Sequence, residues 1–224
     1  MSADFLKLIQ RGAAAEVAEA VAADPTLVCW RDSQGVSALL WAVYCGQEAV
    51  RDFLRARLAA EGVALDIFEA AATGDQARLR TILEAEPKAV HSFSGDGWTP
   101  LHLAAAFGAP AAVATLLACG ARVDAVSRNA QQNQPLHAVL ELGKDLETVR
   151  LLLEHGALAN AAQAGGFTPI FSAAAANRKD LAELLAAHGV DPRRRSDAGK
   201  TPADFARERG HAEMALWLDA QPVP

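Results

Sequence analysis

The sequence has few cysteines and no sign of a disulfide framework. Its three cysteines, Cys29, Cys45 and Cys119, are odd in number, widely spaced and without a C-x-x-C pair. Disulfide-dense scaffolds belong to oxidising compartments, whereas scattered single cysteines are typical of reducing ones. The cysteine pattern therefore argues against a disulfide-stapled domain and favours a cytoplasmic location.

The chain also has fewer positively charged residues than negatively charged ones. The chain has 21 Lys and Arg residues against 27 Asp and Glu residues, which gives a formal net charge of -6. A negative surface repels phosphate backbones and anionic lipids. We therefore expect no nucleic-acid partner and no membrane partner. The basic run Arg193–Arg195 is interpreted as a solvated loop, and a basic end that docks an acidic partner is the alternative.

Long apolar runs are almost absent. Residues 103–121 carry no charge and are long enough to raise the question of a membrane span. However, the run is mostly alanine and is interrupted by Gly108-Ala109-Pro110, which favours a turn between two short helices. The first ten residues also lack the basic and apolar regions of a secretory signal. We expect neither a span nor a signal.

Common catalytic motifs are missing as well. The sequence contains no G-x-S-x-G, no G-x-x-x-x-G-K-[ST] and no H-E-x-x-H, and no G-x-G-x-x-G follows a predicted strand. We therefore expect a protein that is not an enzyme and that holds no cofactor and no metal.

What the sequence does contain is an internal repeat. A four-residue motif with proline in second place recurs at spacings of 35, 34 and 33 residues. Its copies are Thr99-Pro100-Leu101-His102, Gln134-Pro135-Leu136-His137, Thr168-Pro169-Ile170-Phe171 and Thr201-Pro202-Ala203-Asp204, with a degenerate copy at Ser37-Ala38-Leu39-Leu40. A fixed period of this length indicates a stacked array of small units.

Residues 96–124, DGWTPLHLAAAFGAPAAVATLLACGARVD, contain a turn, the motif, an alanine-rich helix, a glycine and a second helix that ends in L-L-x-x-G-A. This pattern resembles the ankyrin repeat, which has a period of about 33 residues and a T-P-L-H-x-A signature. The resemblance covers roughly residues 4–219. It implies an all-α, curved solenoid of helix-turn-helix units with short β-hairpin turns and a concave binding face. Alanine richness and a preference for arginine over lysine favour a bacterial-type member.

A glycine that closes the first helix of each unit extends the count to about seven. Gly and Asn both tolerate the left-handed conformation that caps a helix. The positions are Gly12, Gly46, Gly74, Gly108, Gly143, Asn177 and Gly210. They predict one domain over residues 1–224, with units at 1–31 (N-terminal cap), 32–64, 65–93, 94–127, 128–161, 162–194 and 195–224 (C-terminal cap).

The first half of the chain has a second periodicity. A shift of 62 residues superimposes Gly12 on Gly74 and Pro25 on Pro87, which indicates a duplicated pair of units. The third unit lacks the motif and begins directly with a helix after the short link at residues 57–66. We therefore expect no hairpin there, an interrupted line of hairpin tips, and a notch between the second and fourth units.

Several residues of the repeat have an expected structural role. Pro100 suits the first position of a helix, and Thr99 suits the cap before it. The resemblance implies that His102 and His137 hydrogen-bond within the turn. His155, His188 and Cys119 end successive second helices. Helices pack about 8 to 10 Å apart, so these three cannot share a zinc ion with ligand bonds of about 2.0 to 2.3 Å.

The positions that the ankyrin family leaves variable are candidates for contact with a partner. They lie beside the turn and before the helix-closing glycine, and aromatic side chains there bury a large area at little rotamer cost. The candidate protein-binding residues are Val36, Tyr44, Asp96, Trp98, Phe107, Glu141, Leu142, Phe167 and Lys200. In the alternative interpretation, Trp98 and Phe167 pack over their own hairpins, and Phe107 packs under the next one.

The sequence therefore predicts a non-enzymatic protein–protein interaction module, an adaptor or scaffold, that works as a monomer and binds an unidentified protein. The alternative is a regulatory or inhibitory subunit of an enzyme encoded nearby.

Overall fold

The computed structural model describes residues 2–143 and 145–222, and within these ranges the chain is helical, with no β-strand. The helices follow one another as seven antiparallel pairs, which confirms the expected all-α repeat architecture. In chain order the pairs are α1 (Ser2–Gln10) and α2 (Ala14–Ala23), α3 (Ala38–Tyr44) and α4 (Glu48–Ala60), α5 (Ile67–Thr73) and α6 (Gln76–Ala85), α7 (Pro100–Phe107) and α8 (Pro110–Ala118), α9 (Pro135–Ala138) with η3 (Val139–Gly143) and α10 (Leu146–Glu154), α11 (Pro169–Ala175) and α12 (Lys179–Ala187), and α13 (Pro202–Glu208) and α14 (Ala212–Ala220).

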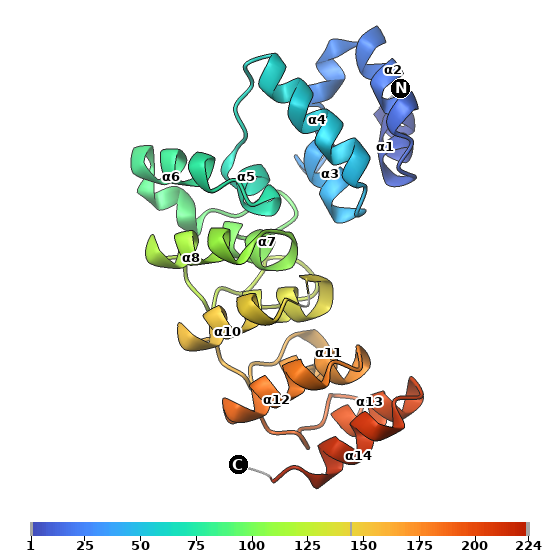
Figure 1. Ribbon diagram of the computed structural model, residues 1–224, viewed down its shortest axis with the longest axis vertical. Coiled ribbons are helices and arrows are strands. Elements are labelled where there is room, and N and C mark those ends of the chain that lie inside the picture. The colour runs from blue at the N-terminus through green and yellow to red at the C-terminus, as the bar shows by residue number, and fades with distance from the viewer. Residues whose placement is uncertain (1, 144, 223–224) are drawn as a thin grey trace.

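The pairs stack into an arc from the N-terminus to the C-terminus (Figure 1). From α5 onward the first helices form one column on the inner side of the arc, and the second helices α6, α8, α10 and α12 form the outer column (Figure 1). One unit cannot bury its apolar stripe alone, so neighbouring units supply the core. Corresponding leucines of successive second helices, Leu116, Leu152 and Leu185, are fully buried. None of the described helices is long and apolar enough to cross a membrane.

The start of α7 forms as the motif predicts. Pro100 occupies the first helical turn, where its missing N–H removes no helical hydrogen bond. The Thr99 hydroxyl accepts a hydrogen bond from the backbone N–H of His102, and the His102 ring accepts one from the Thr99 backbone N–H, at 3.3 Å in each case. This reciprocal capping box satisfies two backbone groups that a helix end would otherwise leave unpaired.

Two of the helix-closing glycines do not adopt the expected left-handed conformation. Gly12 and Asn177 have positive φ, as predicted, but Gly108 has φ -81° and ψ -174°. A Cβ on Gly108 would lie 2.6 Å from the carbonyl oxygen of Ala71, and one on Gly143 would lie 2.8 Å from an oxygen of the preceding unit. The prediction was wrong for Gly108 and Gly143, since close approach of the neighbouring unit requires glycine there.

The turns between units are short hairpins, and in each a backbone hydrogen bond of 2.8 to 3.0 Å joins the two residues at the base of the turn. The closing pairs are Asp32–Val36, Ser94–Trp98, Ser127–Asn133, Gln163–Phe167 and Ser196–Lys200. Successive tips are joined by backbone hydrogen bonds from Arg128 to Gly97 (2.8 Å), Ala164 to Gln131 (3.0 Å) and Asp197 to Gly165 (2.9 Å). The hairpins therefore form a ladder along the array.

The third unit has no hairpin, as expected, because residues 61–66 lead from α4 to α5 without a backbone hydrogen bond of the kind that closes the other turns. The predicted interruption of the hairpin line is nevertheless wrong. Gly95 packs against the backbone of Gln34, so closely that a Cβ on Gly95 would lie 1.5 Å from the Gln34 carbonyl oxygen. The second and fourth units therefore touch directly through their hairpins, and no notch separates them at this edge.

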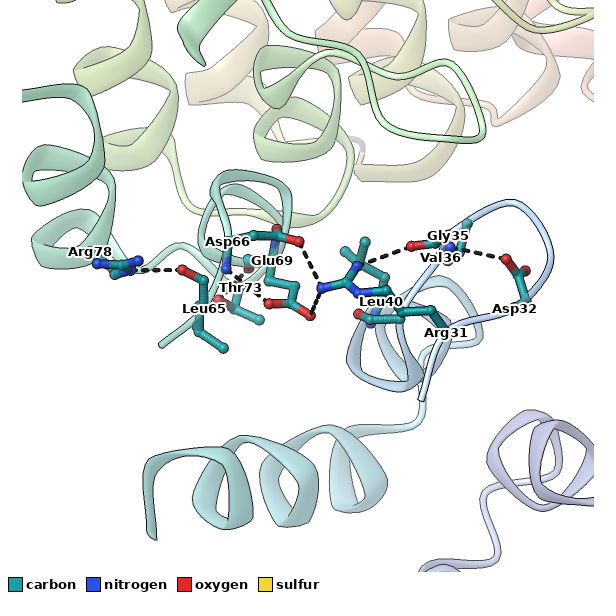
Figure 2. A network of polar contacts seen from close by, with 11 residues as sticks. Arg31, Asp32, Gly35, Val36, Leu40, Leu65, Asp66, Glu69, Thr73 and Arg78 are labelled. Carbon is teal, nitrogen blue, oxygen red and sulfur yellow. Dashed lines mark hydrogen bonds and ion pairs between the residues drawn. The ribbon is translucent and has the colours of Figure 1, made fainter. Parts of the chain in front are cut away.

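The start of α5 is held by Arg31, the residue just before the hairpin of the second unit, in place of a hairpin of its own (Figure 2). The Arg31 guanidinium donates to Asp66 at 2.9 Å, to Glu69 at 3.3 Å and to the carbonyl of Gly35 at 3.0 Å. Asp66 and Glu69 form their own capping box. Burial raises the pKa of Glu69, and the Arg31 charge acts in the opposite direction. Arg31 thus compensates a buried carboxylate at the point where the repeat pattern is interrupted.

Replacing Arg31 with alanine should lower the free energy of unfolding by about 1 to 3 kcal/mol, because Glu69 would lose its cationic partner in a buried site. Urea unfolding followed by far-UV circular dichroism measures the change. Arg122→Ala is the matched control, since its partner Asp124 is exposed and such pairs contribute about 0.2 to 1 kcal/mol. Equal losses in the two variants would contradict the structural role of Arg31.

Candidate functional site

The two family histidines are buried, and each is hydrogen-bonded to a backbone carbonyl outside its own turn. The Nε2 of His102 donates to the carbonyl of Asn133, and that of His137 donates to the carbonyl of Ala161, at 3.0 Å in each case. The hydrogen bonds within the turn were predicted, but the link from His102 to the next unit and the link from His137 to the end of its own unit were not. Burial lowers the pKa of each imidazole to about 4. Both rings are therefore neutral structural groups at pH 7.

Among the described residues, no group of three His, Cys, Asp or Glu side chains is arranged to hold a metal ion. His155 and Cys119 are exposed at the ends of separate second helices.

Tyr44, Asp96 and Phe107, here called the tyrosine cluster, connect the second and fourth units. The Tyr44 hydroxyl donates to the Asp96 carboxylate at 2.9 Å. The Tyr44 ring stacks on Phe107 with centroids 5.3 Å apart, and contacts Trp41 edge to face at 6.0 Å. Burial and the Asp96 charge raise the pKa of Tyr44. All three predicted residues contact other residues of the array. A role in binding a partner therefore stays a prediction for them.

Two further predicted contact residues also lie against the scaffold. The Val36 side chain is only 3% exposed. Its place in the predicted surface was wrong, because the tight hairpin turns this side chain into the core. Trp98 is half-buried and meets the His102 ring edge to face, with centroids 5.5 Å apart. The interpretation that Trp98 packs over its own hairpin agrees with this contact.

An open concavity lies over the inner helices of the fifth to seventh units, and we call it the phenylalanine pocket. It has a volume of about 470 Å³. Phe167, Phe171 and Phe205 form its aromatic wall, with centroids 5.4 Å apart in every pair and interplanar angles between 72° and 88°. The remaining lining residues are Leu140, Glu141, Gln163, Ser172, Ala175, Ala176 and Arg209.

Glu141 reaches the pocket from a π-helical turn, η3. The two helix caps of this unit, Gln134 and Asp145, are eleven residues apart, whereas those of the next unit, Thr168 and Arg178, are ten apart. A π turn accommodates one extra residue in a helix, and such turns are frequent at functional sites. Here the turn carries Glu141, which lines the pocket, and the neighbouring Leu142, which is 51% exposed.

The pocket contains charges of both signs. The Glu141 carboxylate accepts a hydrogen bond from the Gln163 amide, while burial raises the pKa of this acid. On the opposite rim, the Arg209 guanidinium lies 5.5 Å from the Phe205 centroid. Lys200 lies 5.8 Å from the same centroid and pairs with Glu208 at 2.6 Å.

Four of the predicted contact residues thus lie in or beside the phenylalanine pocket: Glu141, Leu142, Phe167 and Lys200. Sequence reasoning missed Phe171, Phe205 and Gln163 as parts of the same site. A signal was present, because Phe171 replaces the histidine of the motif and Phe205 follows a copy that has lost both Leu and His. An aromatic residue at or next to a position of the ankyrin motif indicates a unit whose inner surface differs from that of the other units.

The comparisons with known proteins agree with this architecture. A sequence profile described as ankyrin repeats in three copies matches residues 67–163 and 136–221. ARF GTPase-activating protein GIT2 of Mus musculus is 43% identical over 84 residues, which make up 37% of this chain and 12% of that protein. The transient receptor potential cation channel subfamily A member 1 homolog of Caenorhabditis elegans is 32% identical over 149 residues, 66% of this chain and 12% of that protein.

A third relative, the 2-5A-dependent ribonuclease of Mus musculus, is 48% identical over 59 residues, 26% of this chain and 8% of that protein. The chain therefore spans only a small part of the length of these relatives. All three come from animals, so the bacterial source expected from composition finds no support among them.

Proposed function

Since the chain belongs to the ankyrin-repeat family, we propose that it is a non-enzymatic interaction module that binds a protein partner on its concave surface of hairpins and first helices. A scaffold of this kind serves unrelated activities, so the proposal rests on the site rather than on the fold.

The phenylalanine pocket is the observation that carries the proposal. Phe167 and Phe205 pack on each other across two adjacent units, yet both are only half-buried and face an open surface in this pocket. Leu142 extends the apolar area beside it, with half of its side chain exposed. Aromatic anchors in a recess surrounded by polar groups are typical of protein-binding hot spots.

The test is affinity capture of partners by the wild-type chain and by two matched variants. Leu142→Asp places a charge beside the pocket, while Leu158→Asp places one on a leucine that is 59% exposed after α10. Both leucines are too exposed for either change to unfold the array. A partner that binds wild type and Leu158→Asp, but not Leu142→Asp, is the expected result. A partner that binds all three equally would overturn the use of this surface.

Identification of the captured protein also separates the two forms of the proposal. A scaffold or adaptor joins proteins without altering their activity, whereas a regulatory subunit changes the rate of a bound enzyme. We further propose that the chain works in the cytoplasm as a monomer. The three cysteines, which are all free thiols, support a reducing compartment.

A further inference from the structure

The phenylalanine pocket holds a carboxylate that no cation neutralises among the residues that the structure describes. Glu141 is half-buried, and its recorded partner is the neutral amide of Gln163. A carboxylate that is partly removed from water is stabilised by a cation at hydrogen-bonding distance. The scaffold gives such a partner to the buried Glu69 through Arg31. Glu141 has no equivalent cation within residues 2–143 and 145–222.

A second acceptor lies beside this carboxylate. The side-chain oxygen of Gln163 is buried and has no hydrogen-bond partner among the described atoms. One end of the pocket thus combines the Glu141 carboxylate with a buried, unpaired amide oxygen of Gln163. A group that carries several N–H donors would satisfy both at once.

The aromatic wall suits the same kind of group. An aromatic ring attracts a cation to its face within about 6 Å of the centroid. In this pocket the Phe205 ring already has Lys200 and Arg209 at 5.8 and 5.5 Å. Phe167 meets Phe171 and Phe205 edge to face and is half-buried at the opening. An incoming aliphatic stem can pack along Phe167 while its charged end reaches Glu141.

We propose that the phenylalanine pocket is the subsite for a basic side chain, lysine or arginine, of the partner protein, with the cation against Glu141 and the stem along the phenylalanine wall. This inference rests on the proposed function, because it assigns the chemistry of the residue that the partner inserts. The site combines a carboxylate without a cation, a second acceptor and an aromatic surface within a volume of about 470 Å³.

A titration with a single residue analogue tests the subsite without the partner. The probe is Nα-acetyl-lysine N-methylamide, and the control is the norleucine analogue, which keeps an aliphatic stem but lacks the cation. Two-dimensional ¹H–¹⁵N spectra of the intact chain should show saturable shifts at Glu141, Gln163 and Phe167 with the lysine probe. The norleucine analogue should shift them much less.

Two variants with opposite expected effects sharpen the test. Glu141→Gln should weaken binding of the lysine probe roughly ten-fold, because the charge-assisted hydrogen bond is lost. Arg209→Gln should strengthen it roughly two-fold, because a like charge leaves the rim. Arg209 is an exposed residue of the pocket rim, 5.5 Å from the Phe205 centroid, so the second change alters the charge of the rim and leaves Glu141, Gln163 and Phe167 in place.

Equal shifts with the two analogues, unchanged affinity in Glu141→Gln, or no saturable shift would each overturn the subsite. None of these results would alter capture of a partner by wild type and Leu158→Asp. Conversely, saturable lysine binding with no captured partner would retain the subsite and remove the protein-binding function. The two experiments therefore fail independently.

Discussion

Lowering the pH from 6.5 to 4 should remove about 3 kcal/mol of stability through each of two buried imidazoles, those of His102 and His137. In the folded chain Nε2 donates to a distant backbone carbonyl, that of Asn133 or Ala161, and Nδ1 accepts from a backbone N–H. A second proton on either ring would face that N–H inside a buried turn. Burial therefore lowers the pKa to about 4, against 6.5 in the unfolded chain.

The direction of the effect follows from proton uptake. Between pH 6.5 and 4 the unfolded chain binds a proton on each histidine and the folded chain does not. Stability therefore falls as the pH is lowered through this window and is restored above it. Glu69 and Glu141 act in the opposite direction, because burial raises their pKa values and the folded form accepts their protons more readily.

Urea unfolding at a series of pH values measures the effect, with the double variant His102→Gln, His137→Gln as comparison. A glutamine amide keeps a hydrogen-bond donor but does not titrate. The variant should be less stable than wild type at pH 7 and should lose much less stability between pH 6.5 and 4. Parallel pH profiles of wild type and variant would contradict the assignment to these two rings.

Much of the fold follows directly from local sequence. Thr99 and Pro100 specify a helix start through a cap and a fixed φ, and the structure places them there. The 62-residue shift also corresponds to real elements, since α2 at Ala14–Ala23 matches α6 at Gln76–Ala85, and the 3-10 turns η1 (Pro25–Cys29) and η2 (Pro87–His91) match as well. These features depend on residues within a few positions of one another, which is why a single sequence reveals them.

The uneven spacing of the repeats shows that some units contain extra residues, but the sequence alone does not show where in each unit these residues lie. The step of 35 residues corresponds to a longer hairpin, closed by Ser127 and Asn133 instead of a pair four residues apart. The step of 34 corresponds to the π turn that carries Glu141. An extra residue can be absorbed in a loop or in a helix, and packing against neighbouring units decides between them.

The candidate site was predicted only in part because it depends on how units lie against each other. Phe167 and Glu141 were recognised from positions that vary within the ankyrin family, and both line the pocket. Val36 was assigned to the surface from its position, but the orientation of the hairpin buries it. The meeting of Tyr44 with Phe107 spans an entire unit and depends on the position of α5 between α3 and α7. No local pattern in the sequence encodes that placement.

The contact between Gly95 and Gln34 gives the other large expected effect. Gly95→Val should lower the free energy of unfolding by about 3 kcal/mol, because a Cβ there would overlap a backbone oxygen that cannot rotate away. Gly95 does not need a positive φ, so the loss would report the contact between units and not backbone strain. Asp197→Val is the control at the corresponding place in the last hairpin, where the side chain is exposed.

The variant should also lose cooperativity between the two ends of the array. In a solenoid each unit is stabilised through its neighbours, so forcing apart the hairpins of the second and fourth units weakens the link to residues 4–64. Amide hydrogen exchange should then show faster exchange in α1 to α4 than in α7 to α12, while Asp197→Val leaves α1 to α4 unchanged. Uniform exchange along the array in Gly95→Val would mean that the Arg31 bridge and the stacking of α3 on α5 join the two parts without the hairpin contact.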